Sequence, residues 1–343
     1  MSDHIRFRDI IGQETVIQHF QNALRTGEIS HAYILNGASG SGRRTLASLF
    51  AGALQCGQKD LQAERIEPCG ICRDCLEWQA GTHPDIITLT HEKKNSSDKR
   101  SDLSVDDIRR MRSDIMIRPY SAPYKVYILP DAEKMTVQAQ NALLKMLEEP
   151  PEYAVIFLIS NGTAAFLPTI LSRCVTLTLR PLTQEQVSRW LTEHKQLPKE
   201  QADIYAGFSG GSVGKAAELS ESEGFRELQR SAVRLLRELP MQTSYDLAAF
   251  SKELAGDKGR IRQLIELLQI WYRDVCVWRA ARKPENLIFK EEVQYIIEAA
   301  SRTDNERLGR ILAAFDETLQ QLKYSTNDEL ILEVLLIKLR DNG

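Results

Sequence analysis

Gly37-Ala38-Ser39-Gly40-Ser41-Gly42-Arg43-Arg44-Thr45 is a glycine-rich stretch with the form of a phosphate-binding loop. The apolar run before it, residues 32–35, predicts a buried strand, and the apolar positions within residues 46–54 predict a helix after it. A glycine-rich turn between a strand and a helix presents backbone N–H groups and a helix N-terminus to phosphate. The candidate nucleotide-binding residues are therefore Gly37, Gly42, Arg43 and Thr45.

The side chains of this loop depart from the pattern that binds a nucleotide with magnesium. That pattern, G-x-x-x-x-G-K-[ST], requires a lysine for the terminal phosphates and a hydroxyl for the metal ion. Arg43 stands in place of the lysine and Arg44 in place of the hydroxyl. A guanidinium can pair with phosphate, but it cannot ligate a cation. Because Thr45 comes one position late, its hydroxyl is turned by about 100° on the helix. The loop is predicted to keep its shape without its function.

Length and composition indicate a soluble globular protein of two or three domains. The chain has 343 residues, of which 43% are hydrophobic and 27% are charged. It has no apolar run of about 18 residues and no signal-peptide core, so we expect a cytoplasmic protein. The net charge of −3 gives no general attraction to nucleic acid, and contact with DNA would need a local basic patch.

Strand and helix patterns alternate along roughly the first half of the chain. Further buried strands are expected at residues 86–89, 126–129, 155–159 and 175–179. Helices are expected at residues 14–25, 105–116 and 136–147. This alternation favours a three-layer α/β domain with a parallel sheet. The wholly polar segment 91–102 is expected to form an exposed loop.

A domain boundary is predicted at Arg180-Pro181, because no strand pattern follows it. Thr183 and Gln186 have the spacing of a helix capping box, and a cluster of glycines at residues 207–214 closes a small helical unit. The pattern is helical from residue 222 onward, and the run 330–339 is apolar nearly all round, so we expect it to be buried. The predicted domains are residues 1–180, 181–221 and 222–343.

Four cysteines with the spacing C-x12-C-x2-C-x2-C predict a metal site within residues 56–75. The candidate ligands are Cys56, Cys69, Cys72 and Cys75. Tetrahedral zinc binds four thiolates, and closely spaced cysteines in a turn supply them. Reduced thiols and an iron–sulfur cluster are the alternatives, and His83 is near enough in sequence to replace Cys56. Because four thiolates leave no position for water, the zinc would be structural.

The segment Lys125–Glu133, with sequence KVYILPDAE, resembles a magnesium-binding strand that has lost its first acid. In such a strand, apolar residues precede two consecutive acids that hold magnesium and orient the attacking water. Pro130 stands at the magnesium-binding position and Asp131 at the second acid. Proline has neither charge nor a backbone donor. A strand that ends in a simple Pro-Asp turn is the plainer interpretation.

Two groups of basic residues have open interpretations. Arg173, in Ser172-Arg173-Cys174, is either a surface arginine or a finger for a nucleotide bound by a neighbouring chain. A second group has the spacing to follow a phosphate backbone, although Asp106, Asp107 and Asp114 are interleaved with it. This group consists of Lys145, Arg109, Arg110 and Arg112.

Together these residues resemble the clamp-loader family of AAA+ proteins over almost the whole chain. The matching motifs are Ile11-Gly12-Gln13, His31-Ala32-Tyr33, the cysteine cluster with Gly81-Thr82-His83-Pro84-Asp85, Gln140–Lys145, Leu147–Pro150 and Ile170–Cys174. Asn327 and the leucine-rich helix after it resemble the C-terminal collar of this family. The resemblance implies an AAA+ P-loop-type domain with a five-stranded sheet, a small helical lid, and an all-α collar that joins a hetero-pentameric ring.

Within the clamp loader of DNA polymerase III, the chain resembles a non-motor subunit. Motor subunits keep lysine and threonine in the loop, an acidic pair on the strand, and a lid arginine where this chain has Gly214. The resemblance implies that Ser172 and Arg173 serve catalysis in trans. It implies gamma/tau-type motor subunits, a delta subunit, the sliding clamp and, through the assembly, primer–template DNA as partners, with no membrane. Since the magnesium ligands are missing, we expect no productive binding of ATP with magnesium and no ATPase or polymerase activity of the chain itself.

Two other functions stay open. A slow ATPase that uses Arg43 and Asp131 would bind ATP with magnesium at micromolar concentrations. A zinc-dependent nucleic-acid-binding module on a relic ATPase fold would bind DNA with a steep dependence on salt. The charge of the cysteine segment argues against the second function, because acidic residues outnumber the basic ones. The basic residues there are Lys59, Arg65 and Arg73, and the acidic residues are Asp60, Glu64, Glu67, Asp74 and Glu77.

Overall fold

The computed structural model describes residues 5–89, 103–324 and 327–342, and the loop predicted at residues 91–102 lies outside them. The chain forms two compact units, Met1–Leu182 and Thr183–Gly343. The finer division of the chain into three domains stays a prediction. Among the described helices, none is long and apolar enough to cross a membrane.

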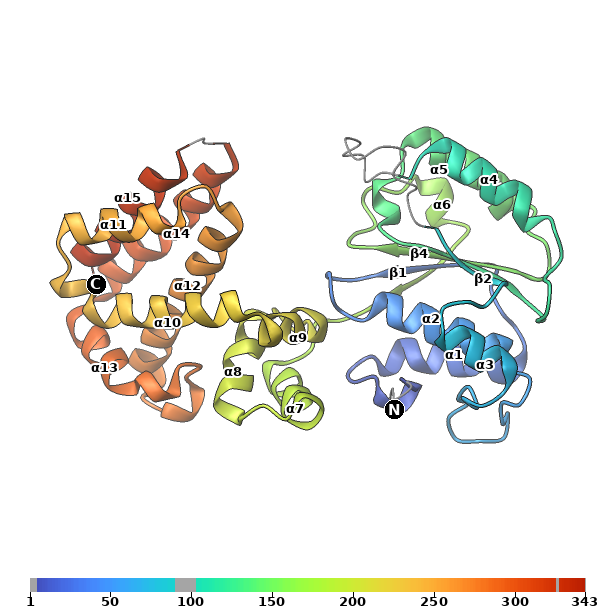
Figure 1. Cartoon of the computed structure of the whole chain (residues 1–343), viewed down its shortest axis with the longest axis horizontal. Coiled ribbons are helices and arrows are strands. Elements are labelled where there is room, and N and C mark those ends of the chain that lie inside the picture. Colours follow the sequence, from blue (N-terminus) through green and yellow to red (C-terminus); the bar gives the residue numbers. More distant parts are fainter. Residues whose placement is uncertain (1–4, 90–102, 325–326, 343) are drawn as a thin grey trace. The chain divides into compact units, whose positions relative to one another are not determined.

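The first unit is built on a five-stranded sheet with the strand order β2-β3-β4-β1-β5 (Figure 1). The strands are β1 (Ala32–Asn36), β2 (Ile86–Thr88), β3 (Lys125–Leu129), β4 (Ala154–Ser160) and β5 (Val175–Thr178). All neighbouring strands are parallel, with Ala32 of β1 paired with Ile156 of β4. Every residue of β3 and β4 is buried, as expected for parallel strands covered on both faces. The predicted strands are confirmed in position, but the expectation that all of them are buried is wrong for β2 and β5, because these two strands form the edges of the sheet and their residues are half-buried or exposed.

Helices cover both faces of this sheet (Figure 1). On one face lie α1 (Glu14–Thr26), α2 (Arg43–Gln55) and α3 (Arg73–Gln79), and on the other lie α4 (Val105–Ile115), α5 (Val137–Glu148) and α6 (Pro168–Leu171). Two short 3-10 helices complete the unit, η1 (Phe7–Asp9) and η2 (Ala132–Lys134). The predicted three-layer α/β fold is therefore confirmed.

Four aromatic side chains form the centre of the core under α1 and α2. Phe20 of α1 stacks on Phe50 of α2 with ring centroids 4.2 Å apart. Tyr33 of β1 stacks on Phe157 of β4 at 5.3 Å. All four side chains are fully buried, and aromatic rings contribute much of the apolar area of a core. This packing holds α2, and the glycine-rich loop that precedes it, against the carboxyl ends of β1 and β4.

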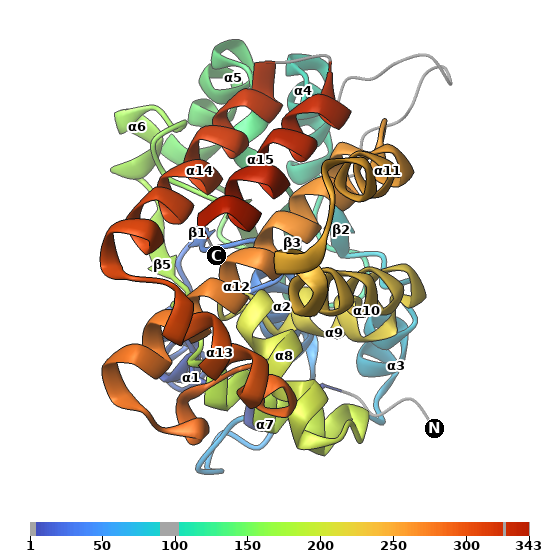
Figure 2. The ribbon, with the colours of Figure 1, turned by 90° about the vertical axis from the view of Figure 1, so that its left-hand side faces the viewer.

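The second unit is helical throughout its described residues. Its helices are α7 (Gln184–Lys195), α8 (Lys199–Phe208), α9 (Val213–Glu221), α10 (Glu223–Glu238), α11 (Ser244–Leu254), α12 (Lys258–Ala281), α13 (Val293–Arg302), α14 (Asn305–Tyr324) and α15 (Asp328–Asn342), with the 3-10 turns η3 (Leu239–Met241), η4 (Pro284–Asn286) and η5 (Lys290–Glu292). The capping box of Thr183 and Gln186 begins α7 as predicted. Figure 2 shows α14 and α15 packed side by side.

The expectation that residues 330–339 are buried all round is wrong for one face of α15. Leu332, Leu335 and Leu336 are fully buried, whereas Leu330 is 53% exposed and Val334 is 41% exposed. The buried leucines follow the spacing of three and four residues that places side chains on one helical stripe. The second apolar face of α15 is therefore open to solvent in the isolated chain.

Candidate functional site

The glycine-rich loop lies where the carboxyl ends of β1, β3 and β4 meet, because β3, β4 and β1 are neighbours in the parallel sheet. The Gly37 amide donates a hydrogen bond of 3.1 Å to the carbonyl of Ser160 at the end of β4. Gly42 caps α2 with a φ of +90°, a left-handed conformation that glycine adopts without strain. The loop therefore stands between β1 and α2, with Arg43 as the first residue of the helix.

Arg43 is buried and hydrogen-bonded within the protein, with only 8% of its surface exposed. Its Nη2 donates a hydrogen bond of 2.8 Å to Oδ1 of Asn161, and Nδ2 of Asn161 donates one of 2.6 Å to Oε1 of Glu133. Burial lowers the pKa of the Arg43 guanidinium, and the carboxylates of Glu133 and Asp131 oppose this shift. An arginine with nearby carboxylates stays charged. The cation at the lysine position is thus engaged by groups of its own chain.

Asp131 is also paired within the chain. It follows Pro130 at the end of β3 and adopts a left-handed φ of +49°. Its Oδ2 lies 3.9 Å from Nη2 of Arg44 and 3.7 Å from Nζ of Lys134. Thr45, which follows Arg44 on α2, is half-buried. The arginines at the lysine and hydroxyl positions therefore face acidic or amide groups at the ends of β3 and β4.

Asn161 and Glu133 are the residues of this site that the sequence analysis missed. Asn161 directly follows β4, and Glu133 lies in η2 after β3. The signal that could have found them was their position, since polar residues just after buried parallel strands gather at one edge of the sheet. Asn161 is the first residue after the apolar run of β4, which marks this position in the sequence.

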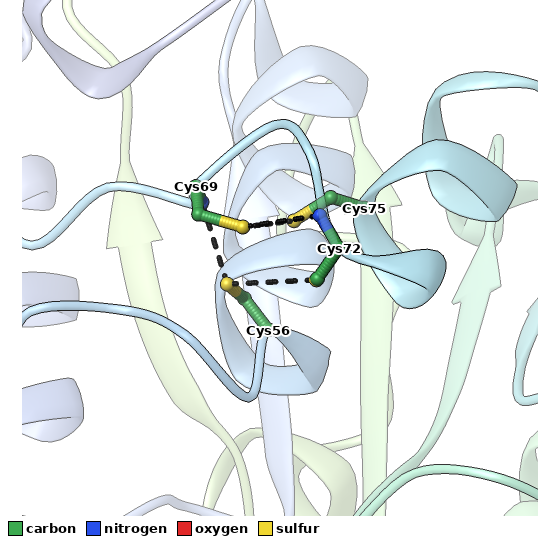
Figure 3. A group of neighbouring side chains, drawn as sticks. All are labelled: Cys56, Cys69, Cys72 and Cys75. Carbon is green, nitrogen blue, oxygen red and sulfur yellow. Dashed lines mark hydrogen bonds between the residues drawn. The ribbon is translucent and has the colours of Figure 1, made fainter.

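The four candidate metal ligands come together in the first unit (Figure 3). Cys56 follows α2, Cys69 and Cys72 precede α3, and Cys75 lies within α3. Their sulfur atoms all lie within 4.8 Å of one another. The sulfurs of Cys69 and Cys75 are 3.9 Å apart, and those of Cys72 and Cys56 are 4.0 Å apart. Four thiolates around a tetrahedral zinc ion are separated by about 3.8 Å, so the cluster has nearly this size.

Backbone amides point at two of these sulfurs. The amides of Cys69 and Cys72 donate to the sulfurs of Cys56 and Cys69, each at 3.3 Å. Burial raises the pKa of the Cys56 and Cys75 thiols. Burial acts in the same direction on Cys69, but hydrogen bonds from the amides of Ile71 and Cys72 lower its pKa to about 7. Buried thiols become stable thiolates when a cation such as zinc binds them, so these residues fit a structural zinc ion.

His83 belongs to a separate group and does not join the cysteines. Its buried ring lies with the carboxylates of Asp74 and Glu77. Nδ1 of His83 accepts the amide N–H of Asp85 at 3.1 Å, so in the neutral ring Nε2 carries the proton. This Nε2 lies 3.6 Å from Oδ1 of Asp74. The four sulfur atoms lie together and the His83 ring lies in the second group, so the structure places Cys56, rather than His83, with the other three cysteines.

Ser172 and Arg173 lie between α6 and β5. Nη2 of Arg173 lies 3.0 Å from Oε1 of Glu148, and Nη1 donates a hydrogen bond of 3.0 Å to the carbonyl of Thr169. The hydroxyl of Ser172 donates to the same carbonyl at 3.1 Å. The Arg173 side chain is 35% exposed, so it is neither a core residue nor a fully solvated one.

The basic residues of α4 and α5 do not form an uninterrupted basic surface. Arg109 pairs with Asp106 at 3.2 Å, and Arg110 pairs with Asp107 at 2.6 Å. Lys145 is exposed on α5, which packs against α4. The acids interleaved along α4 therefore offset much of its positive charge, and contact with a phosphate backbone stays a prediction.

Two family models match the chain. The model described as DNA polymerase III, delta subunit, matches residues 12–183, and the model for the C-terminal part of the delta subunit matches residues 233–341. The chain belongs to the clamp-loader subunit family of DNA polymerase III. The first family model spans most of the first unit, and the resemblance found in the sequence is confirmed at the level of the family.

Relatives of two kinds align with this clamp-loader chain. The delta' subunit of Pseudomonas aeruginosa is 32% identical over 90% of this chain and 91% of its own length. The delta' subunit of Bacillus subtilis is 26% identical over 96% of both chains. The tau subunit of Bacillus subtilis is 26% identical over 97% of this chain, which spans 61% of the length of tau. The delta' relatives therefore match in length, whereas tau extends well beyond the aligned part.

Proposed function

We propose that this clamp-loader chain is a non-motor subunit of the delta-prime type, which does not hydrolyse ATP and presents Arg173 to ATP on a neighbouring motor subunit. In this role it helps to load the sliding clamp on primed DNA during replication. Its partners would be gamma/tau-type motor subunits and a delta subunit in a hetero-pentameric ring, with the clamp and primer–template DNA. The alignment with two delta' subunits over nine tenths or more of each chain supports this assignment.

The engagement of Arg43 by Asn161 carries the proposal. A motor subunit needs a free cation at this position for the terminal phosphates and a hydroxyl for magnesium. Here the guanidinium is buried and bonded to Asn161, and Arg44 faces Asp131. Pro130 stands at the position of the magnesium-binding acid, and Gly214 in α9 stands at the position of the arginine that motor subunits carry in the lid. Magnesium neutralises much of the charge that develops in phosphoryl transfer, so loss of its ligands should abolish turnover.

The test of the finger uses the reconstituted clamp loader with ATP, primed DNA and clamp. Arg173→Ala should slow hydrolysis at the site next to this chain by about 10³-fold in a single-turnover assay. Arg189→Ala is the matched control, because Arg189 is also a surface arginine paired with a glutamate, at 3.1 Å. Normal single-turnover hydrolysis and clamp loading by the Arg173→Ala assembly would refute the proposed role.

A slow ATPase that uses Arg43 and Asp131 is the alternative function. The pairing of both side chains within the chain argues against it. Equilibrium binding of labelled ATP with magnesium to the chain alone separates the two functions. Micromolar binding followed by slow release of phosphate would favour the ATPase.

The second part of the proposal is that Cys56, Cys69, Cys72 and Cys75 hold one structural zinc ion. Zinc supplies the positive charge that the buried thiolates require and joins the end of α2 to the start of α3. Lys59 lies beside the cluster and donates hydrogen bonds of 3.0 Å to the carbonyls of Leu54 and Cys56. A nucleic-acid-binding role for this module has less support, because the ammonium group of Lys59 is already hydrogen-bonded to carbonyls at the end of α2.

A further inference from the structure

The Arg173 side chain is folded back onto its own domain. Its Nη1 donates to the carbonyl of Thr169 at 3.0 Å and to the hydroxyl of Ser172 at 3.4 Å. Its Nη2 lies 3.0 Å from Oε1 of Glu148. These two nitrogens are the ones that a fork-like contact with phosphate uses. In the isolated chain, therefore, the phosphate-binding end of Arg173 is already occupied.

Two packed helices create this retracted position. Glu148 is the last residue of α5, and Arg173 comes two residues after the end of α6, which packs against α5. The Thr169 carbonyl lies in the last turn of α6, where carbonyl groups lack a partner within the helix. A carboxylate at the end of one helix and a carbonyl at the end of the other, which also accepts the Ser172 hydroxyl, thus form a binding place for a guanidinium.

The hold on Arg173 is weak enough to be reversed. The side chains of Arg173 and Glu148 are 35% and 50% exposed, and ion pairs this exposed are weakened by solvent. The terminal phosphates of ATP carry more negative charge than one carboxylate and accept a guanidinium bidentately. ATP bound to a neighbouring motor subunit is therefore able to take Arg173 from Glu148, and the side chain can return after phosphate leaves.

We propose that Glu148 is a positioning residue that holds Arg173 retracted until a neighbouring subunit presents the phosphates of bound ATP. This inference rests on the proposed role of Arg173 in trans. Glu148 would compete with the nucleotide for the same guanidinium, so its charge would set the ATP concentration at which the finger engages. It would leave the rate of the chemical step unchanged, because it is no longer in contact with Arg173 at that stage.

The experiment compares Glu148→Gln with the matched control Glu149→Gln in the reconstituted loader. Glu149 is the next residue, carries the same charge and is also exposed, but no ion pair links it to Arg173 in the structure. We expect Glu148→Gln to lower the KM for ATP by about two- to fivefold, as the loss of an exposed ion pair allows, with kcat unchanged. We expect Glu149→Gln to change neither parameter. In an Arg173→Ala background, Glu148→Gln should have no further effect.

Each other outcome would overturn the inference. A lower kcat for Glu148→Gln at unchanged KM would mean that Glu148 aims Arg173 at the phosphate rather than retracting it. Equal effects of Glu148→Gln and Glu149→Gln would show a general effect of charge. If Arg173→Ala itself leaves hydrolysis unchanged, the proposed function fails and this inference falls with it. If Arg173→Ala slows hydrolysis while Glu148→Gln does nothing, the inference alone fails.

Discussion

Arg43, at the lysine position of the phosphate-binding loop, donates a hydrogen bond of 2.8 Å to Asn161 at the end of β4. The two residues are separated by 118 positions in the chain. The side-chain amide of Asn161 in turn donates a hydrogen bond to the carboxylate of Glu133, which lies after β3. The position that a lysine occupies in a motor subunit is thus held here by two consecutive hydrogen bonds that join residues after β1, β4 and β3.

We expect that restoring the sequence of the loop alone will not restore ATP hydrolysis. The double variant Arg43→Lys, Arg44→Thr restores the loop pattern and frees Asn161, so we expect tighter binding of ATP with magnesium. We expect no hydrolysis, because Pro130 still replaces the magnesium-binding acid. Labelled-nucleotide binding and phosphate release measure the two effects. The triple variant that adds Pro130→Asp is the comparison, and hydrolysis by the double variant alone would contradict this account.

The contact between Gly52 and Trp78 predicts a link between the sheet domain and the cysteine module. A Cβ atom at Gly52 of α2 would lie 2.5 Å from Cδ2 of Trp78 in α3. The indole is held in place because its Nε1 donates to Oγ of Ser48 at 2.9 Å. Gly52→Ala must therefore displace a rigid ring and the helix that carries Cys75. We expect destabilisation by about 1–3 kcal/mol and weaker zinc retention, measured by urea unfolding and by metal analysis after dialysis.

Gly224→Ala provides the control for that variant. Gly224 also lies in a helix, α10, but nothing lies within 4 Å of the position of its added Cβ. Alanine there should be neutral or stabilise the protein by up to about 1 kcal/mol, because glycine is a poor helix former. If Gly52→Ala and Gly224→Ala destabilise the protein equally, the contact with Trp78 is not the cause of the effect at Gly52.

Replacement of one ligand of the cysteine cluster should abolish zinc binding. We expect about one zinc ion per wild-type chain and none in Cys72→Ser, because three thiolates hold zinc far less tightly than four. The free energy of unfolding of the first unit should fall with the loss of the metal, and a chelator should lower it only in the wild type. Cys276→Ser is the control, since Cys276 lies in α12 of the second unit. If the purified wild type contains no zinc and a chelator does not lower its free energy of unfolding, the site is excluded.

Asp274 predicts a pH dependence of stability in the second unit. Its buried carboxylate accepts the amides of Ile288 and Phe289, each at 2.8 Å, and pairs with Arg273 at 2.6 Å. Burial raises the pKa of Asp274 above its ordinary value of 3.8, and these hydrogen bonds offset only part of the shift. The folded chain therefore binds this proton more tightly than the unfolded chain. The contribution of Asp274 to the free energy of unfolding is largest below pH 3.8, and it falls as the pH rises through the pKa of the folded chain.

The measurement is urea unfolding of the wild type and of Asp274→Asn over a pH series that begins near the ordinary pKa of 3.8 and continues upward. The stability of the wild type relative to Asp274→Asn should decrease as the pH increases, because the variant has no proton to lose. Asp316→Asn, at an exposed position of α14, should show no such trend. A relative stability that rises with pH would mean that the hydrogen bonds outweigh burial.

Local patterns in the chain were sufficient for the sheet, the loop and the composition of the cysteine cluster. Consecutive apolar residues mark the buried strands because a parallel strand covered on both faces cannot place polar side chains there. The glycines of the loop and the short spacing of Cys69, Cys72 and Cys75 are likewise local, since neighbouring residues must adopt one turn. These features needed no knowledge of distant contacts.

The partners of the functional arginines became visible only when the chain was folded. Asn161 and Glu133 meet Arg43 because β3, β4 and β1 are adjacent in the sheet, an order that differs from their order in the chain. Glu148 meets Arg173 because α5 packs against α6. Such contacts depend on how elements far apart in sequence are placed, and no spacing of residue types records that placement. The same reason explains why one apolar face of α15 is exposed although its sequence is apolar nearly all round.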